Sequence, residues 1–338
     1  MDIEFHYYMT HLIALRAGFK PKDALTIACA SQYTDDNEVS YSITGGDNPY
    51  ESCISQTMDI TKPQQERLSI YPLFHFCPAG IEEIFKAAPL RRDGAYHRLD
   101  TLPDNTNARK IFSDAMKSND LHRIGIGAHM YADTFCHRDF VGWKDPFNWT
   151  QLDGVVGELW SAVGPAIGHA LAMHSPDIPT LVWEDARLIS MERDKSNKDQ
   201  ILAAAGNIFD FFCASTKPGG IKAKKRKLLG DLGEAIGYEV ESVAEAEAGK
   251  AARVESYKTL LGADYTEYNK EQWFDAAVDR QVDPQTVGTS DVKYNYSWKV
   301  DYQQSDWFAF QEAVKAHQAV AYNVLGETFG AMEIDIGG

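Results

Sequence analysis

The sequence predicts an all-α protein, a multi-helix bundle with one irregular or β-containing excursion near residues 39–70. Apolar side chains recur at helical spacing over residues 3–17. A glycine ends this stretch at Gly18, and Pro21 suits the first turn of a second helix. Residues 39–70 instead combine glycine, proline and hydroxyl side chains, which favour turns or a small hairpin.

Residues 1–215 are interpreted as one helical domain. Apolar positions repeat at helical spacing over 121–137, 155–173 and 201–212, in addition to the first helix. These stretches are long enough to bury a common core. The candidate functional residues lie almost entirely within this unit, since nine of the ten histidines precede residue 175.

Residues 216–338 are expected to form a helical extension that packs on or covers the first domain. The extension opens with a basic run at 222–227, followed by a stretch rich in Ala, Glu and Lys at 234–258. We expect an exposed helix pair there, with the basic run as a solvated helix face rather than a phosphate or membrane contact. A last amphipathic helix is expected at 305–325.

The composition narrows the class of protein. The chain has 338 residues, of which 44% are hydrophobic and 24% charged, as in soluble globular proteins. Lys and Arg total 33 against 49 Asp and Glu, a net charge of −16, which argues against bulk electrostatic binding of nucleic acid. There is no run of 18 apolar residues, so no transmembrane segment is expected.

The expected location is the cytoplasm. The N-terminus carries acids where a signal peptide would carry lysines. The five cysteines form no C-x-x-C pair, which argues against a disulfide framework or a thiolate zinc site.

The strongest functional motif is an H-x-x-x-D-x-x-x-H formed by His129, Asp133 and His137. On a helix, steps of four residues advance about 400° and about 6 Å, so the three side chains share one stripe. The stripe spans about 12 Å, too long for one ion to take all three ligands. Imidazole and carboxylate suit zinc or another divalent first-row metal, so the motif indicates two or more ions near Asp133 or, alternatively, histidines paired to a buried aspartate.

Other potential ligands precede and follow this motif. His6 and His11 lie on the first expected helix, and Asp35 and Asp36 close the second. Each of the remaining candidates is weak when taken alone, and they are His75, His169 and His174.

The ordered set of histidines and aspartates resembles the zinc-dependent phospholipase C enzymes and the related single-strand nucleases. These helical proteins hold a three-zinc cluster. By this resemblance, one ion would be held by Asp36 or Asp35 together with His75, His129 and Asp133. A second would be held by His137 with His169, and a third by His6 or His11 with Asp133. The resemblance covers residues 3–185.

The chain departs from that family in three places. The family places its next histidine six residues after the aspartate, whereas His137 is four after Asp133. Its third zinc also uses the free amino terminus of a processed chain, whereas this sequence starts at Met1. Met173 stands where an acid is expected after His169, with His174, Asp177 or Glu158 as substitutes.

The resemblance and the motif together predict a metal-dependent phosphoester hydrolase, acting on a small phosphoester or a phospholipid. Two or three zinc ions are expected, with manganese or iron as substitutes. Asp133 would bridge ions, while Asp36, Asp35 or Asp139 would accept a proton from water. The alternatives are an HD-type phosphohydrolase, disfavoured because no His-Asp dipeptide occurs, and a non-catalytic interaction module of toxin or effector type. A di-iron helical protein is a further alternative, but it is disfavoured because the sequence has none of the Glu-x-x-His pairs that such proteins use.

Overall fold

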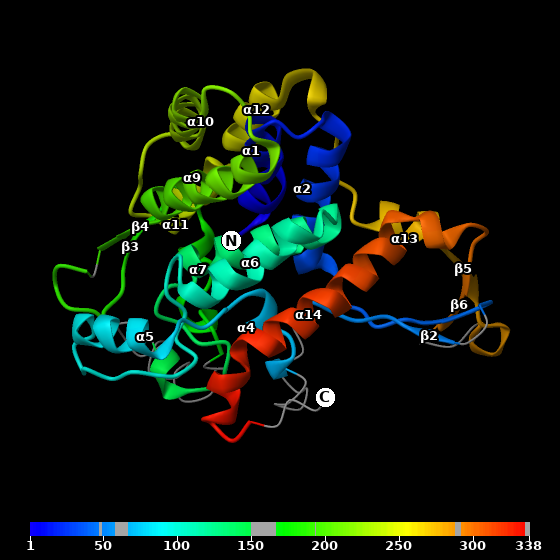
Figure 1. Cartoon of the computed structure of the whole chain (residues 1–338), viewed down its shortest axis with the longest axis horizontal. Coiled ribbons are helices and arrows are strands. Elements are labelled where there is room, and N and C mark those ends of the chain that lie inside the picture. The colour runs from blue at the N-terminus through cyan, green and yellow to red at the C-terminus, as the bar shows by residue number, and fades with distance from the viewer. Residues whose placement is uncertain (47–48, 58–66, 150–166, 193, 288–291, 335–338) are drawn as a thin grey trace.

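The computed structural model describes residues 1–46, 49–57, 67–149, 167–192, 194–287 and 292–334. These residues form a mostly helical fold with two small sheets (Figure 1). The prediction of a mainly helical protein is therefore confirmed. The β-structure is more extensive than one excursion, because strands also occur in the segment after residue 181 and in the C-terminal part.

The first half of the chain supplies the helices around the core. The first is a π-helical segment, η1, which continues directly into α1. Helix α1 ends at its C-cap residue Gly18, whose φ is 102°. The elements are η1 (Glu4–Met9), α1 (Thr10–Ala17), α2 (Pro21–Asp36), α4 (Tyr71–Phe74), α5 (Ile81–Ala87), η2 (Ala88–Leu90), α6 (Thr106–Ser118), α7 (Leu121–Cys136), η3 (Pro146–Asn148), η4 (Ala170–Ala172) and η5 (Ser175–Asp177).

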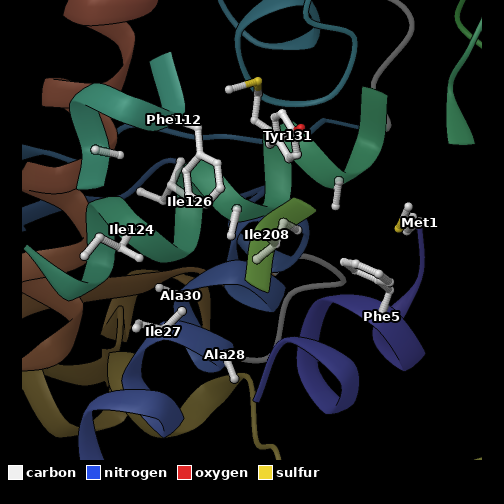
Figure 2. Close-up of a cluster of buried hydrophobic side chains, with 14 of the residues drawn as sticks. Met1, Phe5, Ile27, Ala28, Ala30, Phe112, Ile124, Ile126, Tyr131 and Ile208 are labelled. Carbon is white, nitrogen blue, oxygen red and sulfur yellow. The ribbon is translucent and has the colours of Figure 1, made fainter. Parts of the chain in front are cut away.

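Helices α2 and α7 cross in close contact because α7 has glycine at the crossing. A Cβ atom added at Gly125 would lie 2.5 Å from the carbonyl oxygen of Ile27 and 2.6 Å from the Cβ of Ala30. Such distances exclude any side chain without movement of one helix. Figure 2 shows Ile27 and Ala30 on the side of Ile124, whereas Ile126 lies beside Phe112. The contact fixes the end of α2 relative to the stripe of His129 and Asp133 on α7.

The second half adds helices on two sides of this core. Helix α9 packs on α7 and α1, and the long α14 packs on α7 and α6. The elements are α9 (Asn197–Thr216), α10 (Ile221–Ile236), α11 (Val243–Ala248), α12 (Lys250–Leu261), η6 (Gly262–Asp264), α13 (Glu271–Ala277), η7 (Pro284–Thr286), η8 (Tyr302–Gln304) and α14 (Asp306–Gly330). One hydrophobic core contains side chains from both units expected from the sequence.

The larger sheet joins the two halves of the chain. Its strand order is β2-β1-β6-β5, with Ile43 of β1 opposite Tyr296 of β6 in a parallel pair. The smaller sheet is the antiparallel pair of β3 and β4. The strands are β1 (Ser42–Thr44), β2 (Tyr50–Glu51), β3 (Val182–Glu184), β4 (Asp194–Ser196), β5 (Val278–Val282) and β6 (Tyr294–Trp298).

The helix expected at 155–173 lies largely outside the described residues, and its described end, 167–173, contains the short helical turn η4. The exposed helix pair expected from the basic run at 222–227 through residue 258 is observed as three helices, α10, α11 and α12. Among the described residues, none of the helices has the length and apolar character needed to cross a bilayer.

Candidate metal centre

Helix α7 carries the central part of the site. It begins after Asp120, whose carboxylate accepts hydrogen bonds from the backbone N–H groups of His122 and Arg123. His129 and Asp133 lie one turn apart on α7, and His137 follows its last residue. All three side chains are buried, so the stripe predicted from the spacing of the motif faces the interior.

The carboxylate of Asp133 lies at the centre of the cluster. Its Oδ1 is 2.6 Å from the Met1 amine and 3.2 Å from His6 Nε2. Its Oδ2 is 3.2 Å from His75 Nδ1 and 3.3 Å from His129 Nε2. The two oxygens of this one carboxylate therefore face two different sets of nitrogen atoms.

Two groups of potential ligands adjoin each other at His129. The first group consists of His6 from η1 with His129 and Asp133, and the second of Asp35, His75 and His129. Within each group the ligand atoms lie within 4.8 Å of one another. The rings of His6 and His129 stack with centroids 3.8 Å apart. Because His129 belongs to both groups and Asp133 reaches both, the ligands form one continuous cluster.

A third group lies at the end of α7 and consists of His137, His169 and Asp177. The Asp177 oxygens lie 3.5 Å from His137 Nε2 and 3.5 Å from His169 Nε2. His169 directly precedes η4, and Asp177 ends η5. These two short helical turns bring both residues to the same place as His137.

Backbone carbonyl groups fix the tautomers of three histidines. His75 Nε2 lies 2.9 Å from the carbonyl oxygen of Ser55, and His137 Nδ1 lies 2.7 Å from that of His75. His169 Nδ1 lies 2.8 Å from the carbonyl oxygen of Met173. A carbonyl oxygen only accepts, so each of these nitrogens carries the proton and the other keeps its lone pair. That lone pair faces the carboxylates, the arrangement found in metal-binding histidines.

Several buried atoms of the cluster have no hydrogen-bond partner among the described residues. They are both ring nitrogens of His6, Nδ1 of His129 and Oδ1 of Asp177. Two of these atoms still lie within ion-pair distance of a charged group, His6 Nε2 of Asp133 and Asp177 Oδ1 of the Met1 amine, but neither contact forms a hydrogen bond. A buried polar atom left without a partner costs about 1–3 kcal/mol, and an imidazole lone pair that faces a carboxylate is repulsive unless a cation lies between them. Nitrogen and oxygen donors of this kind are those that zinc prefers, and manganese and iron also accept them. The residues present therefore fit a divalent metal.

The electrostatics of the cluster keep Asp133 ionised and His6 neutral. Burial and the neighbouring His129 lower the pKa of His6 to about 4. Burial raises the pKa of Asp133, but the Met1 amine, His137 and His129 outweigh it and hold this pKa well below its usual range. These are the protonation states that metal ligands require.

A cavity of about 680 Å³ adjoins the cluster. Asp35 and Asp177 line it from the cluster, and Gln32 lines it from α2. Its other wall includes Glu247 of α11 and Lys250 of α12. The C-terminal unit thus contributes directly to the space beside the candidate ligands.

The structure does not bring every predicted site residue into the cluster. His11 is buried on α1, where burial lowers its pKa to about 4, and it belongs to none of the three groups. Asp36 instead accepts hydrogen bonds from Tyr268 Oη at 2.7 Å and Gln32 Nε2 at 3.2 Å. The side chain of Asp36 is therefore occupied by its neighbours, and Asp35 is the α2 carboxylate that reaches the cluster.

Two further candidates also lie outside the three groups. Asp139 is ion-paired to Lys195 at 3.0 Å and to Arg138 at 3.2 Å, so its role as a proton acceptor has no support in the geometry. His174 lines the cavity without entering a ligand group. Glu158, one of the substitutes for an acid after His169, lies outside the described residues.

From the sequence, Asp177 was one of three residues that could replace the missing acid after His169. In the structure, Asp177 is the carboxylate of the third group. It stands eight residues after His169, and the intervening turns η4 and η5 bring it back. The Ser175-Pro176 pair, typical of a tight turn, was the available signal. The Met1 amine is the second group that the sequence did not place here.

The fold and the site define a mostly helical protein with buried, adjoining groups of histidine and aspartate. The chain belongs to DUF6765, a family of unknown function, whose model matches residues 1–325. The match covers all three ligand groups and most of α14. No curated protein and no solved structure matches the chain.

Proposed function

We propose that this protein is a metal-dependent hydrolase of phosphoester bonds, with phosphodiesters as its preferred substrates. The observation that carries the proposal is the Asp133 carboxylate, whose two oxygens face adjoining ligand groups that share His129. A shared carboxylate between neighbouring groups is suited to two or more ions, which is the arrangement used for displacement at phosphorus. The similarity in ligand order to phospholipase C enzymes agrees with this reading.

The bound cations would lower the pKa of water and stabilise the entering and leaving oxygens of the phosphoester. The chain's own residues hold the imidazole and carboxylate groups in place around these ions. Asp35 is 25% exposed, against 1% for Asp133, and it lines the cavity. If His75, His129 and Asp133 hold the neighbouring ions without Asp35, then Asp35 is the carboxylate of the cluster best placed to accept a proton from the side of the substrate.

The proposed cofactor is zinc, two or three ions, with manganese or iron as substitutes. The proposed substrate is a small phosphoester or a phospholipid that enters the cavity lined by Asp35 and Asp177. The net charge of −16 does not oppose an anionic substrate, because bound cations dominate the local field.

The decisive experiment is elemental analysis of the purified chain, followed by assays with bis(p-nitrophenyl) phosphate and p-nitrophenyl phosphate. We expect bound metal at more than one ion per chain and hydrolysis of the diester. His6→Gln should lose metal and activity. His11→Gln is the matched control, because it removes a buried histidine five residues away that belongs to no ligand group.

Wild-type protein that stays free of metal after preparation with zinc, manganese and iron would contradict the proposal. Bound metal without hydrolysis of either phosphoester would support the cluster but contradict the hydrolase. Equal losses in the His6 and His11 variants would show that the assignment of ligands is wrong.

A further inference from the structure

We infer that helix α12 positions the N-terminal ligand segment, with Arg253 as the principal positioning residue and Lys250 as a second. The inference rests on the proposed metal site, because the segment in question carries His6. Arg253 and Lys250 belong to the C-terminal unit, for which neither the motif nor the family resemblance suggests a role.

The strongest contact is a buried, two-pronged ion pair. Arg253 Nε donates to Glu4 Oε2 at 2.9 Å, and Arg253 Nη2 donates to Glu4 Oε1 at 2.7 Å. The Glu4 side chain is fully buried and that of Arg253 is 6% exposed. Arg253 Nη1 also donates to the carbonyl oxygen of Ala246 at 2.7 Å, which ties the guanidinium to α11. A planar guanidinium held at three points fixes both the direction and the distance of its carboxylate.

A second ion pair lies at the start of α12. Lys250 Nζ is 2.7 Å from Asp2 Oδ2. The Asp2 side chain also accepts a hydrogen bond from the backbone N–H of Glu4 at 2.9 Å, and the Asp2 carbonyl accepts one from the backbone N–H of His6 at 3.0 Å. The backbone of His6 is therefore hydrogen-bonded to a residue that α12 holds directly.

The contacts come from one face of α12. Lys250, Arg253 and Tyr257 are spaced three and four residues apart, so they share a side of the helix. Tyr257 stacks on Tyr8 of η1, with ring centroids 6.2 Å apart. These three residues of α12 thus contact Asp2, Glu4 and Tyr8, which lie on both sides of His6 in the sequence.

This arrangement has a physical consequence for the ligand group of His6, His129 and Asp133. His129 and Asp133 are fixed by α7, whereas His6 comes from a π-helical segment near the chain terminus, where helices fray unless anchored. π-Helical turns are also frequent at functional sites. A buried ion pair adds little stability compared with a well-packed apolar pair. We therefore assign the Glu4–Arg253 pair to the geometry of His6 rather than to stability alone.

The test separates these two roles with a pair of variants. Arg253→Met leaves Glu4 buried without its partner, and it should lower both the unfolding temperature and zinc affinity. The double variant Glu4→Leu with Arg253→Met replaces the ion pair by an apolar pair, and it should recover most of the unfolding temperature. Zinc is titrated into the metal-free full chain in competition with a chromophoric chelator.

In the folded double variant we expect one class of zinc ion to bind about 10- to 100-fold more weakly, the range seen when residues behind metal ligands are changed. Ions held by His137, His169 and Asp177 should bind as in the wild type. Arg123→Met is the control, because it removes an arginine ion pair with Asp114, 2.6 Å long, that does not touch residues 1–9. It should leave zinc affinity unchanged.

Wild-type zinc affinity in the folded double variant would overturn the positioning role and leave the proposed function intact. A wild-type chain that binds no zinc would overturn the metal site itself. Weaker zinc binding in Arg123→Met, equal to that of the double variant, would also overturn the inference, because general destabilisation would then explain both.

Discussion

The protein has two buried polar clusters whose residues adjoin in the sequence at His137 and Asp139, and their carboxylates are neutralised by different kinds of groups. The first is the ligand cluster around Asp133. The second begins two residues after His137 and joins Asp139, Asp185, Arg187 and Lys195. In the second cluster Lys195 Nζ lies 3.0 Å from Asp139 Oδ2 and 3.2 Å from Asp185 Oδ2. Arg187 donates to both oxygens of Asp185, at 2.9 and 2.7 Å.

The difference between the clusters is the source of positive charge. In the ionic cluster, the chain supplies its own cations, and burial of Asp185 is outweighed by Arg187 and Lys195, which hold its pKa below the usual range. In the ligand cluster, the described side chains bring no Lys or Arg within ion-pair distance of Asp133 or Asp177. The positive group beside these two carboxylates is the Met1 amine, 2.6 Å from Asp133 Oδ1 and 3.3 Å from Asp177 Oδ1, and their other neighbours are imidazoles. One buried ammonium group leaves the carboxylates of the ligand cluster with less positive charge than those of the ionic cluster, and the proposed metal ions would supply the difference.

The largest expected effect is on metal affinity, and it is measured with one substitution in each cluster. Asp133→Asn should weaken metal binding by more than about 100-fold, beyond the loss seen for residues behind the ligands. Asp139→Asn should destabilise the fold while the folded protein keeps its metal. Metal titration and urea unfolding of both variants measure the contrast, and loss of metal in the folded Asp139 variant would contradict it.

Lys195→Met should cost about 3–5 kcal/mol of unfolding free energy, because it leaves two buried carboxylates without their shared cation. The measurement is urea unfolding. Lys227→Met is the control, since Lys227 is 63% exposed and its pair with Asp231 should contribute at most about 1 kcal/mol. Similar losses in both variants would mean that the ionic cluster is no more than a surface network.

Gly125→Ala should destabilise the protein by about 1–3 kcal/mol, the usual cost of overpacking. The added methyl group would overlap the carbonyl oxygen of Ile27, so α2 must move and carry Asp35 away from His129. Weaker metal binding should accompany the loss of stability. In contrast, Gly326→Ala on α14 meets no atom within 4 Å and should be neutral or stabilising.

At any single pH near neutral the smallest expected effect is that of a histidine outside both clusters, because it develops only as the pH is lowered. Burial lowers the pKa of His317 to about 4, while its ring stacks on Phe74 and its Nε2 donates to the carbonyl of Leu73. Between pH 6.5 and 4 the unfolded chain takes up a proton that the folded chain does not, so stability falls as pH is lowered. His317→Gln should reduce this slope by up to one proton, about 1.4 kcal/mol per pH unit. Unfolding measured at several pH values tests it, and an unchanged slope would contradict the assignment.

The helical class and the central stripe of the site were predictable because both depend on short-range spacing. The period of apolar residues defines a helix and its buried face, and four-residue steps place His129, Asp133 and His137 on one side of it. The small sheets were harder to predict. Strand β1 pairs with β6, more than 250 residues away, and such pairing leaves little local signal in strands of three to five residues.

The choice between neighbouring candidates was not predictable. Asp35 and Asp36 are adjacent, so their side chains point about 100° apart on α2, and only the packing of α2 against α7 decides which carboxylate reaches the cluster. The choice between His6 and His11 was also not predictable from the sequence, because the winding changes from π-helical to α-helical between them. A one-residue shift in helical phase exchanges a ligand for a core side chain.

The sequence by itself determined which residue types are available and which of them share a helix face, because these properties depend only on composition and on the period of the helix. The tertiary structure decided which carboxylates meet Lys and Arg side chains and which meet imidazoles and the Met1 amine. That distinction depends on contacts between segments far apart in the chain, such as Asp139 with Lys195, and Glu4 with Arg253. No local spacing encodes such contacts, since they arise only when the helices pack.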